Sequence, residues 1–96
     1  MTPEFHPAAQ EELTAAVKTG EERAAGLGHE LLHEVRCVVR MLCGSPEVGK
    51  PLGTLYRRFP LRRFPFALVY RIDGERLRII ANAHRRRRPG YWRRRK

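Results

Sequence analysis

The sequence is poor in residues on which several common functions depend. Its only serine, Ser45, stands in a turn before a proline, which argues against a serine triad. Its two cysteines, Cys37 and Cys43, would lie about 9 Å apart along one helix axis, too far for a disulfide. We interpret both cysteines as small core residues in a reducing compartment.

Long apolar runs are also missing. No stretch approaches the roughly 18 apolar residues that a membrane helix needs, and the first residues lack the apolar centre of a secretion signal. We therefore expect a cytoplasmic protein with no membrane partner. The length of 96 residues, of which 42% are hydrophobic, allows one domain with a modest core.

Acidic residues become scarce in the second half of the chain. Residues 1–49 hold four Lys/Arg and eight Asp/Glu, a balance of 4 − 8 = −4. Residues 50–96 hold sixteen Lys/Arg against Asp73 and Glu75 alone, a balance of 16 − 2 = +14. Such an asymmetry indicates an anionic partner, which could be a nucleic acid, an acidic protein or an anionic membrane surface.

Two helices are predicted in the first half, after a short edge strand at 2–5. The first helix opens at Pro7, a position where proline is tolerated, and ends between Gly20 and Gly26. The second follows Gly28 and runs to about Cys43. Because the link between them is short, we expect an antiparallel helical hairpin. Apolar residues at helical spacing mark the buried face of the second helix, namely Leu31, Leu32, Val35, Val38, Val39 and Leu42.

The hydrophobic period changes to that of strands after residue 53. Strands are predicted at 54–59, 64–72 and 76–84, and Asp73-Gly74 forms a tight turn between the last two. We predict an α+β fold, an N-terminal helical hairpin packed on a three- to four-stranded antiparallel sheet. Alternation along the last strand defines an apolar face of Leu77, Ile79, Ala81 and Ala83. The opposite face, with Ile80 as the exception, comprises Arg76, Arg78, Asn82 and His84.

One motif matches a metal-site pattern. The segment His29-Glu30-Leu31-Leu32-His33 fits H-E-x-x-H, in which two imidazoles one helical turn apart bind zinc. At about 100° per residue, however, His29 and His33 fall on the stripe of Arg36 and Arg40, opposite the core face. Both histidines then point to solvent, with two cations beside any zinc. We reject a metalloprotease and expect no metal and no cofactor.

Arginines and aromatic residues interleave in the basic half. Arginine suits phosphate because its planar guanidinium binds two oxygens at once and stays charged, and aromatic rings can stack on bases. A solubilising basic tail at 93–96 is the ordinary alternative, and we leave open whether that tail is disordered. The candidate target-binding or nucleic-acid-binding residues are Arg57, Arg58, Arg62, Arg63, Arg85, Arg87 and Arg88.

Several pieces of the sequence, in their order and spacing, carry a resemblance to a known family. They are Phe5-His6-Pro7-Ala8-Ala9, Glu12-Leu13, the helix and stop from Gly28 to Pro46, Arg57-Arg58, the run from Arg63 to Tyr70 and the run from Ala83 to Trp92. Together they resemble the RelE/ParE superfamily of bacterial toxins from type II toxin–antitoxin modules. The resemblance implies that residues 1–96 form a single toxin-like domain, with two helices on an antiparallel sheet and a cognate antitoxin that covers the basic face.

Within this superfamily the resemblance favours one of two targets. RelE-like members cut mRNA on the ribosome without a metal, whereas ParE-type members poison DNA gyrase. The nuclease type carries an arginine where this sequence has Ala67, and the stretches 64–66 and 84–92 look more like the ParE type. We therefore favour gyrase inhibition. The alternative, a ribosome-dependent endoribonuclease, has as its candidate catalytic residues His84, Arg86, Tyr91 and Trp92.

The partners follow from the same resemblance and from charge. The cognate antitoxin is expected to be acidic and partly disordered, laying an amphipathic segment on the helices or an extended one on the sheet. The expected target is DNA gyrase or, in the alternative, the ribosome with its mRNA. A hypothesis outside the toxin class is a small basic nucleic-acid-binding protein, whose affinity would fall steeply with salt.

Overall fold

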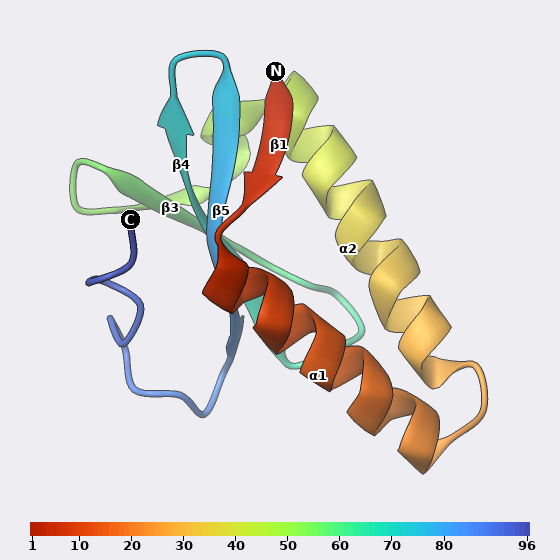
Figure 1. The fold of residues 1–96 in the computed structure, drawn as a ribbon. Coiled ribbons are helices and arrows are strands. Elements are labelled where there is room, and N and C mark those ends of the chain that lie inside the picture. Colours follow the sequence, from red (N-terminus) through yellow and green to blue (C-terminus); the bar gives the residue numbers. More distant parts are fainter.

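Two helices lie side by side on one side of a sheet, and the C-terminal segment lies on the other side (Figure 1). The computed structural model describes residues 1–96. The α+β class and the helical hairpin are as predicted from the sequence. In chain order the elements are β1 (Thr2–Phe5), α1 (Pro7–Arg23), α2 (Leu27–Gly44), the single 3-10 turn η1 (Pro46–Val48), β2 (Lys50–Leu52), β3 (Tyr56–Pro60), β4 (Phe66–Asp73) and β5 (Arg76–His84). Neither helix is both long and apolar enough to cross a bilayer.

The sheet differs from the expected one in strand number and direction. It has five strands in the order β1-β5-β4-β3-β2, of which β1 runs parallel to β5 and the other neighbours are antiparallel. The parallel pair brings the first strand beside the last one, so that Thr2 lies opposite Arg76 and Phe5 lies opposite Ile79. The additional strand β2 falls in a stretch rich in proline and glycine, where side-chain alternation gives no strand signal.

The helical hairpin depends on a specific start and a close approach. His6 caps α1, because its Nδ1 accepts a hydrogen bond of 3.0 Å from the Ala8 backbone amide. Burial is the main cause that lowers the pKa of His6, and Arg78 lowers it further, so the ring is held in the neutral form that can accept. At the hairpin, a Cβ on Gly28 would lie 2.3 Å from the Val17 carbonyl oxygen, so only glycine fits between the helices.

The sheet is buried on both faces. The larger core lies between the sheet and the helices and includes Leu31, Leu42, Leu68 and Leu77. A smaller core lies on the other face, where the C-terminal segment covers the sheet. It comprises Val69, Ile80, Ala81 and Trp92, with Leu52, Tyr56, Ala83 and Tyr91 at its margin.

The predicted faces of the last strand are wrong beyond a β-bulge, which lies opposite Val69 and Tyr70. Tyr70 pairs with Ile79 and Val69 with Ala81, which leaves Ile80 as the extra residue. Leu77 and Ile79 therefore pack toward the helices, whereas Ala81 and Ala83 pack on the opposite face. Asn82 and His84, predicted to share a face with Arg76 and Arg78, instead line a cavity beside the helices. The exception at Ile80 was the sequence signal of this bulge.

The cysteine prediction is wrong for one of the two residues. Cys37 is exposed on α2, and Cys43 is half-buried at the end of the same helix. Both thiols are free. The Cys37 sulfur lies 3.5 Å from Nε2 of His33, one turn earlier. Cys37 lies one position from Val38 and two from Val39, which face the core, so a shift of about 100–200° around the helix places its thiol on the surface.

Candidate target-binding site

The arginines that the sequence offers as candidates occupy three separate places in the structure. Arg57 is held at the β2 edge, where it donates hydrogen bonds of 2.9 and 2.8 Å to the carbonyl oxygens of Glu47 and Gly49. Arg62 and Arg63 lie beside α2, where Glu34 accepts from both of their backbone amides. Arg63 also pairs with Glu30 at 3.1 Å. These three residues are thus separate from the remaining basic candidates.

The remaining candidates gather around a pocket of about 250 Å³ between β3, the end of β5 and the C-terminal segment. We call it the arginine pocket. Leu52, Val69, Ala83 and Trp92 form its apolar wall, and no carboxylate lines it. Its five arginines are Arg58, Arg85, Arg87, Arg88 and Arg93. Sequence reasoning identified four of these five and missed Arg93, which it left in the basic tail.

Aromatic rings position the guanidinium groups of the pocket. Trp92 is only 4% exposed and meets Tyr56 edge to face, with ring centroids 4.7 Å apart. The Arg93 guanidinium lies 4.8 Å from the centre of the Trp92 ring, and that of Arg87 lies 3.9 Å from the centre of the Tyr91 ring. The two rings therefore serve as supports for cations, and their faces are already occupied.

A half-buried carboxylate on α1, Glu12, fastens the C-terminal segment. Glu12 accepts hydrogen bonds from the Tyr91 hydroxyl at 2.6 Å and from the Arg95 guanidinium at 2.8 and 3.0 Å. It also accepts from the Asn82 backbone amide at 3.1 Å. Burial alone would raise the pKa of Glu12, but these hydrogen bonds outweigh it and lower the pKa below its ordinary value. The segment that carries the pocket is thus tied to the helical hairpin.

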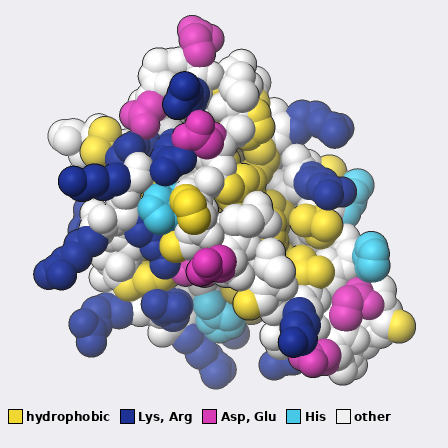
Figure 2. Space-filling model, viewed as in Figure 1, with side chains coloured by type: hydrophobic (Ala, Val, Ile, Leu, Met, Phe, Trp, Pro, Cys, Tyr) yellow, Lys and Arg dark blue, Asp and Glu magenta, His cyan; other side chains and the backbone are white.

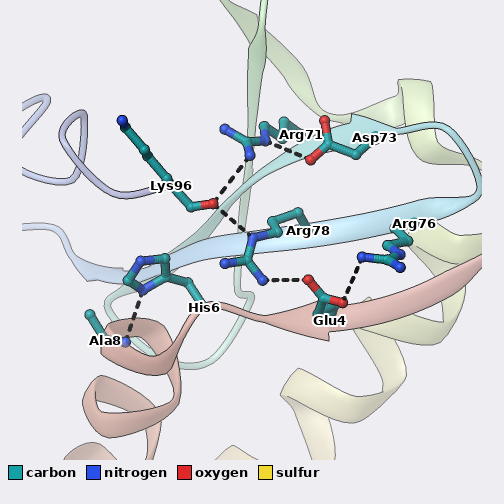
Figure 3. Close-up of polar contacts among 8 residues, drawn as sticks. All are labelled: Glu4, His6, Ala8, Arg71, Asp73, Arg76, Arg78 and Lys96. Carbon is teal, nitrogen blue, oxygen red and sulfur yellow. Dashed lines mark hydrogen bonds and ion pairs between the residues drawn. The ribbon is translucent and has the colours of Figure 1, made fainter.

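The last residues also lie against the sheet. The Lys96 carbonyl oxygen accepts hydrogen bonds of 3.2 Å from Arg71 and from Arg78, as Figure 3 shows. In the same figure Glu4 pairs with Arg76 and Arg78. A further pair joins Arg71 to Asp73 at 2.9 Å. The basic side chains of this sheet surface are therefore largely neutralised within the chain, in contrast to those of the arginine pocket.

Three of the four candidate nuclease residues, His84, Tyr91 and Trp92, line the arginine pocket. His84 accepts a hydrogen bond from the Arg86 amide through Nδ1 and meets the Phe66 ring edge to face. The Tyr91 hydroxyl is engaged by Glu12, and burial together with that carboxylate raises the pKa of Tyr91 to about 12. Trp92 belongs to the smaller core. Arg86 is exposed in the turn after β5 and does not line the pocket.

A second surface feature is apolar. A groove of about 560 Å³ lies between β1 and the two helices, and hydrophobic side chains are visible between β1 and α2 in Figure 2. Phe5, Leu13, Leu32, Val35 and Val39 line the groove, with Arg36 and Arg40 at its edge. Basic side chains in the same view gather around the sheet and the C-terminal segment, and others lie along the helices.

The fold is similar to that of a protein of known structure. A solved structure described as the chromosomal ParDE TA system from P. aeruginosa matches with a TM-score of 0.65 and 20% sequence identity, over 88% of this chain and 95% of that chain. The helical hairpin on a mixed sheet is thus the fold of a known toxin–antitoxin component. No protein of curated function matches the sequence.

The sequence itself matches a known protein family. Residues 4–89 match the family of the ParE toxin of the type II toxin–antitoxin system parDE. The chain belongs to the ParE toxin family, and this membership implies an antitoxin partner. The matched range ends before Gly90, so Tyr91, Trp92, Arg93 and Arg95, which complete the arginine pocket and its attachment, lie beyond it.

Proposed function

We propose that this toxin arrests growth by inhibiting DNA gyrase through surface binding, without cutting RNA. Membership of the ParE family supports the target. The observation that carries the mechanism is the state of the four candidate catalytic residues. His84, Tyr91 and Trp92 all line the arginine pocket, but Tyr91 and Trp92 are held in structural contacts, which leaves His84 there without a second group for acid–base chemistry.

Apart from His84, the candidate residues offer no group suited to the proton transfers of RNA cleavage. The 2′-hydroxyl must lose a proton, and the leaving oxygen must gain one. Tyr91 keeps its proton, because its pKa is raised to about 12 and its hydroxyl donates a hydrogen bond to Glu12. The Trp92 indole has no acid–base role at neutral pH. Arginines stay charged and make poor bases. Ala67, at the position where the nuclease type carries a cation, is 2% exposed, so no charge stabilises a transition state there.

Charge complementarity supports an acidic antitoxin as the silencing partner. Five pocket arginines lack a carboxylate, and an acidic segment would neutralise them before the toxin meets its target. Gyrase acts on chromosomal DNA, so this function places the toxin in the cytoplasm.

Two measurements test the function. Toxin freed from its antitoxin is titrated into purified gyrase with relaxed plasmid, and cellular mRNA is examined by primer extension after controlled expression. We expect supercoiling to fall and the messages to stay intact. Full supercoiling activity at micromolar toxin would contradict the proposal. Codon-phased cuts that disappear in His84→Ala would establish the nuclease instead.

A further inference from the structure

The arginine pocket lacks the internal partners that the neighbouring basic residues have. Arg71, Arg76, Arg78 and Arg95 each pair with a carboxylate of the chain. None of the five pocket arginines forms an ion pair, and no Asp or Glu lines the pocket. Gathering like charges around one cavity costs free energy in the isolated chain. An anionic ligand would offset that cost.

We propose that the arginine pocket binds the phosphate backbone of duplex DNA, sequence-independently, so that the toxin holds both gyrase and the DNA on which gyrase acts. The choice of DNA rests on the proposed function. Binding of phosphate by the pocket rests on its geometry alone.

Size and surroundings of the pocket suit a phosphate group. Its volume of about 250 Å³ is below the roughly 300–1,000 Å³ of drug-sized ligand sites. Arginine side chains line the pocket from several elements: Arg58 from β3, Arg85 and Arg87 from the turn after β5, and Arg93 from the last turn. A phosphate presents oxygens in several directions, whereas a planar carboxylate is satisfied by one or two guanidinium groups. The apolar wall of Val69 and Trp92 lowers the local dielectric and strengthens each contact.

The aromatic residues indicate backbone contact rather than base recognition. Proteins that hold single strands stack bases on exposed rings. Here Arg93 and Arg87 cover Trp92 and Tyr91, and Trp92 is buried. The pocket also lacks Asn and Gln, which read adenine in the major groove. A duplex, held by its phosphates, fits these features better than a single strand.

The test is the affinity of the toxin for a short duplex, measured by fluorescence anisotropy between 50 and 200 mM salt. In the pocket variant Arg85→Gln, Arg87→Gln and Arg88→Gln are combined. A control variant combines Arg36→Gln, Arg40→Gln and Arg62→Gln, which removes the same net charge from exposed positions on or beside α2.

We expect the pocket variant to bind more than tenfold more weakly, and its slope of log affinity against log salt to flatten by about 2.7, since each phosphate contact contributes about 0.9. The control variant should change less than threefold. Equal losses in the two variants would overturn the proposal, because the overall field alone would then explain binding. Binding of a poly-glutamate peptide without binding of the duplex would also overturn it and identify an acidic peptide as the occupant.

A gyrase assay on the same proteins separates this proposal from the proposed function. If wild-type toxin inhibits gyrase but does not bind duplex, the phosphate site is wrong and gyrase inhibition stands. If the pocket binds duplex with the expected salt slope while gyrase is unaffected, the site stands and the proposed target is wrong. Circular dichroism of both variants checks that they fold, which we expect because all six substituted arginines are exposed.

Discussion

Replacing Glu12 by glutamine should loosen the C-terminal segment and destabilise the whole domain. In the wild type this carboxylate joins α1 to Tyr91, to Arg95 and to the Asn82 backbone. Glutamine keeps the shape of the side chain and one acceptor oxygen. It loses the negative charge, so the Arg95 guanidinium is left in a largely buried place with no counter-ion.

The size of the effect follows from burial. The side chains of Glu12 and Arg95 are 17% and 18% exposed. Removing one partner of a buried ion pair costs about 3–5 kcal/mol, and because both groups keep some contact with solvent we take the lower end, about 3 kcal/mol. For a domain of this size such a loss lowers the melting temperature by roughly 12–24 °C. Arg95→Met in the same chain should recover part of the loss, since no unpaired cation then remains.

Urea denaturation followed by circular dichroism measures the change in the free energy of unfolding. The control is Glu11→Gln, because Glu11 precedes Glu12 on the same helix but is exposed and unpaired. That control should stay within about 0.5 kcal/mol of the wild type. A loss below about 1 kcal/mol for Glu12→Gln would refute our account of the attachment, because it would fall in the range of exposed ion pairs.

Three further changes test other parts of the fold. The folded state lowers the pKa of His6 below its ordinary 6.5, so the contribution of this cap is present above that pH and lost on acidification. His6→Asn keeps a capping acceptor, and its urea midpoint should fall less than that of the wild type between pH 7 and pH 5; parallel curves would contradict this. Asn82→Leu should raise the free energy of unfolding by about 1 kcal/mol, because the buried carboxamide of Asn82 has no hydrogen-bond partner. A lower melting temperature for this variant would show that the carboxamide does have a partner. Gly28→Ala should cost about 2 kcal/mol by separating the helices, whereas Gly44→Ala, with open space around it, should be nearly neutral; equal melting temperatures for the two would be inconsistent with the close helix contact.

The helices could be predicted from the sequence because local signals define them. Helical spacing of apolar residues and the proline at position 7 place α1 and α2 within about two residues of their observed starts. The last strand, Arg76–His84, was also predicted with its observed bounds. Its alternation follows the expected pattern only as far as the bulge. There one extra residue, Ile80, moves Ala81 and Ala83 to the face that the C-terminal segment covers.

Long-range pairing explains most of what the sequence could not reveal. The parallel pairing of β1 with β5 and the contact of Glu12 with Arg95 join residues more than 70 positions apart. The hydrophobic periodicity of the sequence carries no information on such contacts. The role of the tail residues was therefore missed, and Arg93 and Arg95 looked like part of an ordinary basic tail.

The arginines show why composition alone does not locate a site. Arg57 and Arg58 are adjacent, yet one is held by two backbone carbonyls and the other faces the pocket. Strand alternation puts them on opposite faces of the sheet. Which of them stays free depends on whether an acceptor lies opposite, and that acceptor comes from elsewhere in the chain.

Chemical-shift mapping on the labelled 11.2 kDa protein tests most directly the claim that the arginine pocket is the surface offered to an anionic target. A short DNA duplex is added stepwise at low salt, and the backbone amides are followed by nuclear magnetic resonance. We predict that the largest shifts fall on Ala83, Arg87 and Gly90, which line the pocket. Shifts concentrated instead on α2 and on Arg62 and Arg63, with the pocket amides unmoved, would contradict it.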